Sequence, residues 1–259
     1  MQDFKYFKKI ISKNILFMMI LVLLLVGVSE RIVNLMVAND SYVLDRNKSI
    51  FRILREPENS VDIIVLGDSL GMTSISPMAW WGDYGMTGYV CGQTGQRMQE
   101  AFHMLQAAYE TQSPKLVILE TNMVFRCKNL SSEVKDCLGE IGYRYIPIFQ
   151  GHDIWKSILS EKQYPAENYK GFAFRCETVP YEQGEYMQKN DQKEEISKIV
   201  SFYLEKIRKL CEKNGTKLLL VSTPSPINCN YARHNSIEAY AREKGLDFLD
   251  LNLKTEEIG

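Results

Sequence analysis

Short runs of apolar residues, each ending in a turn, alternate with segments of helical periodicity along most of this chain. The first run, residues 61–66, stops at Gly-Asp-Ser-Leu. Four later runs occupy residues 88–91, 115–121, 216–222 and 246–251. Short segments that are apolar at consecutive positions are typical of strands buried on both faces of a parallel sheet.

Helical signals separate these predicted strands. Ser76-Pro77 predicts an N-cap and a first helical residue, for a short helix that ends near Gly82 or Gly85. Further helices are expected over residues 96–111, 196–211 and 235–243, with Asn214-Gly215 and Gly245 at the ends of the last two. The alternation of strand and helix predicts an α/β fold in which a parallel sheet is connected by right-handed crossovers.

The segment from 126 to 190 interrupts this alternation. It is rich in Tyr, Gly, Pro and charged residues, and it is much longer than an ordinary connection. We expect a large insertion here, over the active face of the sheet, with a local helical piece at residues 154–159.

The amino terminus has the pattern of a membrane-targeting segment. Lys5, Lys8, Lys9 and Lys13 precede residues 14–29, which carry no charge. The uncharged run is shorter than the roughly 20 residues of a spanning helix, but apolar character resumes at 32–37. We therefore expect an uncleaved single-pass anchor, with the lysines in the cytoplasm and the main domain outside. Cleavage after Gly27-Val28-Ser29 is the alternative.

These patterns divide the chain into three parts: a lysine-rich tail and anchor at 1–37, a stem at 38–60, and the main domain at 61–259. The 31 basic and 32 acidic residues give no net field, so we expect no nucleic-acid partner. Six cysteines form no C-x-x-C pair and three histidines share no metal-ligand spacing, so no metal or other cofactor is expected.

Candidate chemistry gathers where the predicted strands end. Ser69 follows the first strand, Gly92 and Gly95 follow the second, Asn122 follows the third, and Ser225 follows the fourth. Open parallel sheets bind ligands just beyond the carboxyl ends of their strands. Ser69 is therefore a candidate nucleophile, which needs a base and donors for an oxyanion. Cys91 offers a rival thiol, although a small buried hydrophobic residue is the preferred interpretation.

The order of these residues resembles the SGNH, or GDSL, hydrolase family. Gly67-Asp68-Ser69-Leu70 is similar to the first block of that family, Gly92-x-x-Gly95 to the second, and Asn122 to the asparagine of the third. The resemblance implies a three-layer, flavodoxin-like sheet and a serine hydrolase. It makes Ser69 the nucleophile. The oxyanion hole would then consist of the Ser69 N–H, the Gly95 N–H and the side-chain amide of Asn122. Asp68 and Gly92 would lie beside the substrate.

The chain departs from the family in two places. Glu120-Thr121-Asn122-Met123 replaces G-x-N-D, so Glu120 is expected to be a buried carboxyl that needs a partner. No D-x-x-H follows the last strand. Three accounts remain open: a base beyond Gly259, an unconventional base from His234 or from His152 with Asp153, or an inactive fold.

Within the family, the layout is similar to that of membrane-anchored surface proteins of acyl transfer and deacylation, such as the D-alanyl transfer protein of teichoic acid and exopolysaccharide acetylation proteins. This similarity implies an extracytoplasmic esterase or O-acyltransferase that acts on an acylated surface polysaccharide or a teichoic-acid-like substrate. A membrane-bound O-acyltransferase would be a partner, and Arg126 could meet an anionic substrate. The alternative is an inactive SGNH-like domain that binds a glycan or assists that acyltransferase.

Overall fold

A five-stranded parallel sheet forms the centre of the protein, in a computed structural model that describes residues 2–38, 48–126, 130–146, 149, 169–175 and 180–258. The strand order is β2-β1-β3-β4-β5, and every neighbouring pair is parallel. The strands are β1 (Ile63–Gly67), β2 (Gly88–Gly92), β3 (Leu116–Glu120), β4 (Lys217–Ser222) and β5 (Asp247–Asp250). All five predicted strands and the α/β fold are therefore confirmed.

The helices that follow the strands begin and end where local chemistry requires. They are α3 (Ser69–Ser74) and α4 (Pro77–Tyr84) after β1, α5 (Met98–Ala108) after β2, η2 (Thr121–Phe125) after β3, α10 (Tyr231–Lys244) after β4, and η3 (Leu251–Leu253) with α11 (Thr255–Ile258) after β5. The helix α9 (Lys198–Lys213) precedes β4. Gly85 and Gly245 end α4 and α10 in the left-handed conformation. The helix α10 starts earlier than expected, because the Asn230 side chain accepts a hydrogen bond from Arg233 N and caps it there.

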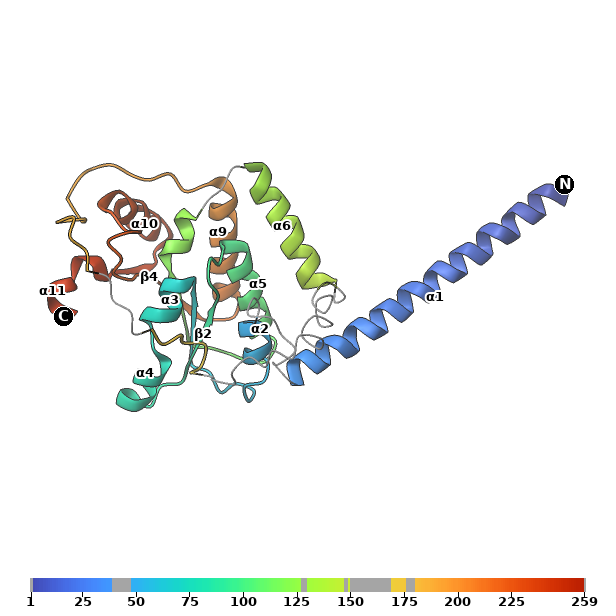
Figure 1. Cartoon of the computed structure of the whole chain (residues 1–259), viewed down its shortest axis with the longest axis horizontal. Helices are drawn as coiled ribbons and strands as arrows, with labels where there is room; N and C mark the ends of the chain where they lie inside the picture. Colours follow the sequence, from blue (N-terminus) through green and yellow to red (C-terminus); the bar gives the residue numbers. More distant parts are fainter. Residues whose placement is uncertain are drawn as a thin grey trace.

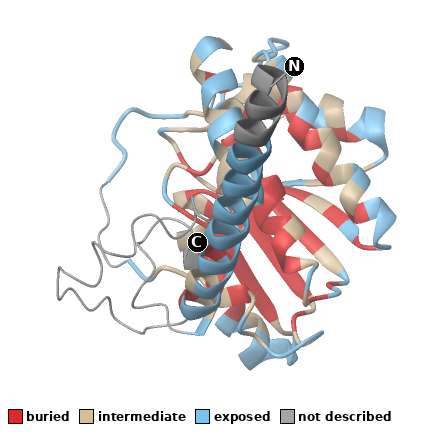
Figure 2. Cartoon of the chain, turned by 90° about the vertical axis from the view of Figure 1, so that its right-hand side faces the viewer, coloured by how far each residue is buried: buried red, intermediate tan, exposed pale blue. Residues whose placement is uncertain are grey.

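The sheet is covered on both faces, which explains why its central strands are apolar at every position. One face carries Ile64, Leu66 and Leu119 and packs against α5, α9 and α10. The opposite face carries Val65, Val90 and other side chains that pack with Ile75 after α3 and with Trp80 of α4. Figure 2 shows the resulting buried sheet between exposed outer surfaces.

The main domain begins before the predicted boundary at residue 61. The helix α2 (Lys48–Ile53) buries Ile50 and Ile53 in the same core as α5. The Ser49 hydroxyl donates to Gly92 O at 2.7 Å. The expectation that residues 38–60 form a stem is wrong for residues 48–53, since two apolar side chains, Ile50 and Ile53, are enough to anchor this short helix in the core.

The amino-terminal helix α1 (Gln2–Ala38) projects from the domain (Figure 1). Residues 12–38 are long and apolar enough to cross a membrane, with a mean hydropathy of 2.4 over their most apolar window. Met36 packs against Phe51 of α2, together with Ile32, Val33 and Val37. The base of α1 is thereby fixed to the domain, whereas residues 12–28 are exposed.

The described parts of the segment 126–190 lie at several places on the domain. The helix α6 (Leu130–Tyr145) lies against α5. Residues 169–173 run beside β2 and α3: Val90 N of β2 donates to Lys170 O at 2.8 Å, and Ala173 N donates to Met72 O of α3 at 2.8 Å. The helical piece expected at residues 154–159 lies outside the described residues.

Gly171 provides a test of this edge contact. Its φ is +81°, and a Cβ there would lie 2.0 Å from Val90 O, whereas Gly184 has φ +79° and open space around its Cβ position. Gly184→Ala is expected to cost about 1 kcal/mol of unfolding free energy through backbone strain alone. Gly171→Ala is expected to cost about 3 kcal/mol or more, because the clash is with backbone. Urea denaturation would measure both, and equal losses would contradict the close approach of this segment to β2.

Candidate active site

Ser69 stands at the carboxyl end of β1, as the first residue of α3. The turn before it is tight, since a Cβ on Gly67 would lie 2.8 Å from Gly71 Cα. The Asp68 side chain caps α3 by accepting a hydrogen bond from Leu70 N at 2.9 Å. Within the described part of the chain, the Ser69 hydroxyl makes no hydrogen bond, and the residue is partly exposed. This is a position from which a hydroxyl can meet a ligand at the edge of the sheet.

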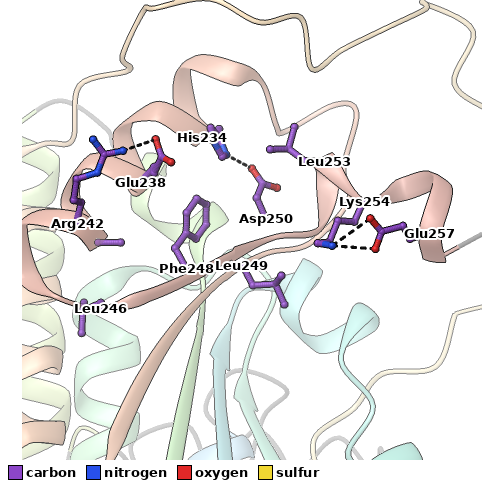
Figure 3. Close-up of a pocket in the computed structure, with 11 residues that line it drawn as sticks. His234, Glu238, Arg242, Leu246, Phe248, Leu249, Asp250, Leu253, Lys254 and Glu257 are labelled. Atoms are coloured by element: carbon purple, nitrogen blue, oxygen red, sulfur yellow. Dashed lines mark hydrogen bonds and ion pairs between the residues drawn. The ribbon is translucent and has the colours of Figure 1, made fainter.

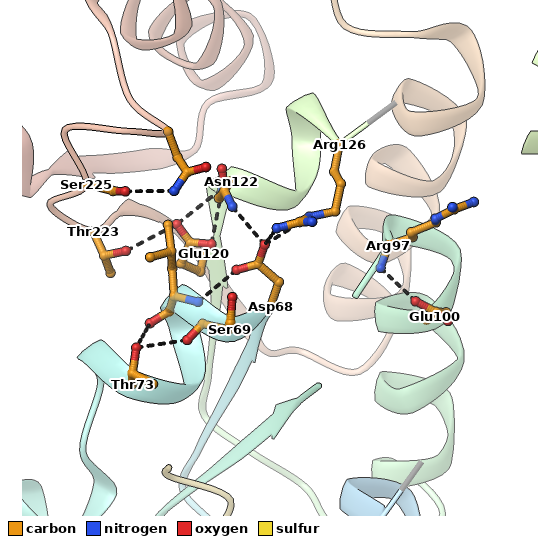
Figure 4. A network of polar contacts seen from close by, with 12 residues as sticks. Asp68, Ser69, Thr73, Arg97, Glu100, Glu120, Asn122, Arg126, Thr223 and Ser225 are labelled. Carbon is orange, nitrogen blue, oxygen red and sulfur yellow. Dashed lines mark hydrogen bonds and ion pairs between the residues drawn. The ribbon is translucent and has the colours of Figure 1, made fainter. Parts of the chain in front are cut away.

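Asp68 joins this turn to the end of β3. Its carboxylate is fully buried. Its Oδ2 accepts from Asn122 Nδ2 at 2.7 Å and from Arg126 Nε and Nη2 at 3.1 and 2.6 Å (Figure 4). Asp68 is therefore a positioning residue for Asn122 and Arg126, and its predicted contact with substrate stays a prediction. Arg126 pairs with Asp68 instead of standing free for an anionic substrate.

The Asn122 side chain consequently lies next to the residue that precedes the candidate nucleophile. An asparagine amide carries two N–H groups, and the bond to Asp68 uses one of them. The other can still donate to an oxygen atom at the rim. The structure thus brings together Ser69 and Asn122, which are separated in the chain by α3, α4, β2, α5 and β3.

Glu120, the departure from the family pattern, is buried directly beneath this site. Its two carboxyl oxygens accept from Asn122 N at 3.2 and 3.1 Å, and Oε1 also accepts from Thr223 Oγ1 at 3.3 Å. Its methylene groups pack near Gly67 and Gly71. Burial, reinforced by the nearby Asp68 carboxylate, raises the pKa of Glu120 to about 8. The partners that this carboxyl needs are therefore the backbone N–H of Asn122 and the hydroxyl of Thr223.

The raised pKa predicts a pH-dependent stability. Because the native pKa is about 8 and the ordinary value is 4.5, the folded protein binds more protons than the unfolded chain between these values. The contribution of Glu120 to the free energy of unfolding is then fully present below about pH 4.5. It is lost as pH rises through 8 and amounts to a few kcal/mol at most. Glu120→Gln, which imitates the protonated carboxyl, is expected to flatten the fall in Tm between pH 5 and 9.

The matched control for this measurement is Glu212→Gln, which changes an exposed glutamate on α9. Its Tm profile is expected to follow that of the parent at every pH. A Glu120→Gln profile parallel to the parent profile would show that Glu120 is ionised in the folded protein at neutral pH.

The second block provides close packing beside β1. Gly92 pairs in register with Gly67, and a Cβ on Gly92 would lie 2.7 Å from Met72 Cγ and 2.8 Å from Gly67 O. Gly92 is buried and shapes the β1–β2 contact, and its predicted place beside the substrate stays a prediction. Gly95 lies three residues further along the same edge, with φ +69° and open space at its Cβ position. Cys91 is completely buried, and burial raises its pKa to about 12, so it is not a rival nucleophile.

The histidines in the described part of the chain do not pair with Ser69. His103 is buried in α5, with Nδ1 3.5 Å from Glu140 Oε1. His234 Nδ1 lies 2.8 Å from Asp250 Oδ2 (Figure 3). The strand order puts β5 three strands from β1, which is roughly 14 Å at the usual strand spacing. His234 is therefore not placed as the base for Ser69, and His152 with Asp153 lies outside the described residues.

No local pattern in the sequence predicts the pairing of His234 with Asp250. Asp250 ends β5, His234 lies in the first turns of α10, and the two side chains line one wall of a cavity of about 470 Å³. Phe248 and Tyr231 flank the imidazole ring, with ring centroids 5.6 and 5.0 Å away. No group of three or more potential metal ligands occurs among the described residues.

Comparison with known proteins adds two distant likenesses. No protein-family model and no curated protein matches the chain. A proposed acylhydrolase of Bacteroides fragilis has a similar structure, with 12% identity and a TM-score of 0.39, over 81% of this chain and 78% of that one. A GDSL-like lipase of Bacteroides thetaiotaomicron has 12% identity and a TM-score of 0.33, over 73% and 67%. Both are too distant to assign an activity, so the site is interpreted from its own residues.

Proposed function

We propose that this protein is a serine acyl-esterase or O-acyltransferase of the SGNH type, with Ser69 as its nucleophile. The observation that carries the proposal is the 2.7 Å hydrogen bond between Asn122 Nδ2 and Asp68 Oδ2. It holds a carboxamide donor beside the Ser69 turn, at the edge of the sheet where ligands bind in folds of this class. A serine hydroxyl, a backbone turn and a neutral amide donor are the groups that acyl transfer needs at one rim.

In the proposed reaction, Ser69 Oγ attacks the carbonyl carbon of an ester while a base takes the hydroxyl proton. The resulting oxyanion accepts the second Asn122 N–H and the N–H of Ser69 and Gly95. Collapse of the tetrahedral intermediate breaks the ester bond, and the leaving alkoxide takes up the proton. Water then releases the acyl group as an acid, or a sugar hydroxyl accepts it as a new ester.

The base in this scheme comes from outside the described residues, because His103 is buried within α5 and His234 lies beside the end of β5, three strands from β1. The same observation favours a second candidate function. Without a base near Ser69, the domain would bind an acylated glycan, or assist a membrane-bound acyltransferase, without turning the ester over.

We also propose that α1 spans the cell membrane once, with its lysine-rich end in the cytoplasm and the domain outside. The continuous helix from Gln2 to Ala38 and the packing of Met36 on Phe51 support an uncleaved anchor over a removed signal sequence. An external domain held close to the membrane suits an acylated surface polysaccharide or a teichoic-acid-like polymer as substrate.

Ser69→Ala tests the nucleophile directly. The intact protein is expected to react with a fluorophosphonate probe and to release p-nitrophenol from a short acyl ester with a burst. The variant is expected to lose the label and roughly 10³-fold or more in kcat. Ser74→Ala, on the exposed side of the same helix, is the control. Full labelling of Ser69→Ala would rule out Ser69, and an unlabelled parent would support the binding domain.

Asn122→Ala tests the oxyanion donor. Loss of one such donor is expected to lower kcat by about 10²–10³ with little change in KM, because the bond forms mainly in the transition state. Thermal unfolding of the same preparation checks that the Asp68 cluster remains folded. An unchanged kcat would show that Asn122 is only a structural partner of Asp68.

A further inference from the structure

The helix α6 is inverted with respect to the domain, because its inner face is polar and its outer face is apolar. Glu133 is 5% exposed and Leu138 is 64% exposed. Polar pairs hold the inner face to neighbouring elements. Three of them join it to α5 and the residues flanking α5: Asp136 with Arg97, Glu140 with His103, and Arg144 with Glu110. The fourth joins Glu133 to Ser197 at the start of α9. A surface helix normally turns its apolar residues toward the core.

The outer face of α6 carries one continuous apolar stripe. Val134, Leu138, Ile141 and Tyr145 are all exposed, and their spacing of four, three and four residues aligns them along the helix. Tyr145 also touches α5, where its ring meets His103 edge-on and its hydroxyl donates to Gln106 Oε1 at 3.4 Å. Ile146 is exposed directly beyond them. We call these five residues the α6 stripe. A contiguous apolar surface of this kind is typical of an interaction site.

The position of α6 relative to α1 indicates what covers the stripe. Figure 1 shows α6 on the side of the domain from which α1 projects, running crosswise to α1. The contacts of Met36 with Phe51 fix the base of α1 to α2, which is itself part of the core. If α1 spans a bilayer, a helix crosswise to it on this side lies along the membrane surface.

We infer that the α6 stripe is buried in the interface of the same membrane that α1 spans. This inference rests on the proposed membrane anchoring. The helix carries Lys135 and Arg144 against Glu133, Asp136 and Glu140, so it has no basic excess to attract anionic lipids. The attachment is therefore through apolar burial and is insensitive to lipid charge. It holds the domain in one orientation on the membrane instead of letting it swing about α1.

Tryptophan reporters in the full chain test the inference. Leu138→Trp reports on the stripe, Leu23→Trp on α1, and Tyr84→Trp on an exposed residue of α4, a helix on the side of the domain away from the projecting part of α1 (Figure 1). Each variant is reconstituted in phosphatidylcholine vesicles with and without brominated acyl chains, and the emission of the parent with its three native tryptophans is subtracted.

Brominated lipid is expected to reduce the emission of the introduced tryptophan roughly twofold or more at positions 138 and 23, and to leave that at position 84 unchanged. Replacing part of the lipid with phosphatidylglycerol is expected to change nothing. Quenching at 23 but not at 138 would overturn this inference and leave the anchor intact, whereas no quenching at 23 would overturn the anchoring itself. Emission at 138 that changes with protein-to-lipid ratio, without quenching, would assign the stripe to a second copy of the chain and also overturn it.

Discussion

The buried carboxylate of Asp68 is the constraint around which the candidate site is arranged. A carboxylate removed from water is tolerated only where charged or N–H donors replace its hydration. Here those donors come from the first turn of α3 and from Asn122 and Arg126, so the end of β1 and the end of β3 are held in one geometry. The position of Asn122 beside the Ser69 turn is a consequence of satisfying this charge.

A second carboxyl in the same site changes the electrostatics. Two buried carboxyl groups side by side repel each other when both are charged, and this repulsion adds to burial in raising the pKa of Glu120. Asp68 has the guanidinium of Arg126, whereas Glu120 has only neutral donors, so Glu120 is the one that stays protonated near neutral pH. Its bonds to the Asn122 backbone and to Thr223 connect the ends of β3 and β4. A family pattern with glycine at this position lacks that connection.

The apolar surface of the protein is divided between two environments. The sheet and its covering helices bury their apolar side chains in the core, while α1 and the outer face of α6 leave theirs exposed. The polar pairs on the inner face of α6 make this arrangement stable, because they let the helix dock with few of its apolar residues, namely Cys137 and the edge of Tyr145. In the proposed attachment, α1 tethers the domain to the membrane and the α6 stripe orients it there.

The sequence by itself determined the strands, most helix ends, the apolar amino-terminal helix and the strand-end positions of Ser69 and Asn122. These features depend on local periodicity, capping and turn chemistry, which neighbouring residues supply. Only the tertiary structure decided that α2 belongs to the core, that α6 turns its apolar stripe outward, that Asp68 holds Asn122, and that His234 pairs with Asp250. Each of these depends on contacts between residues far apart in the chain, whose geometry is fixed by how the layers pack and leaves no periodic trace in the sequence.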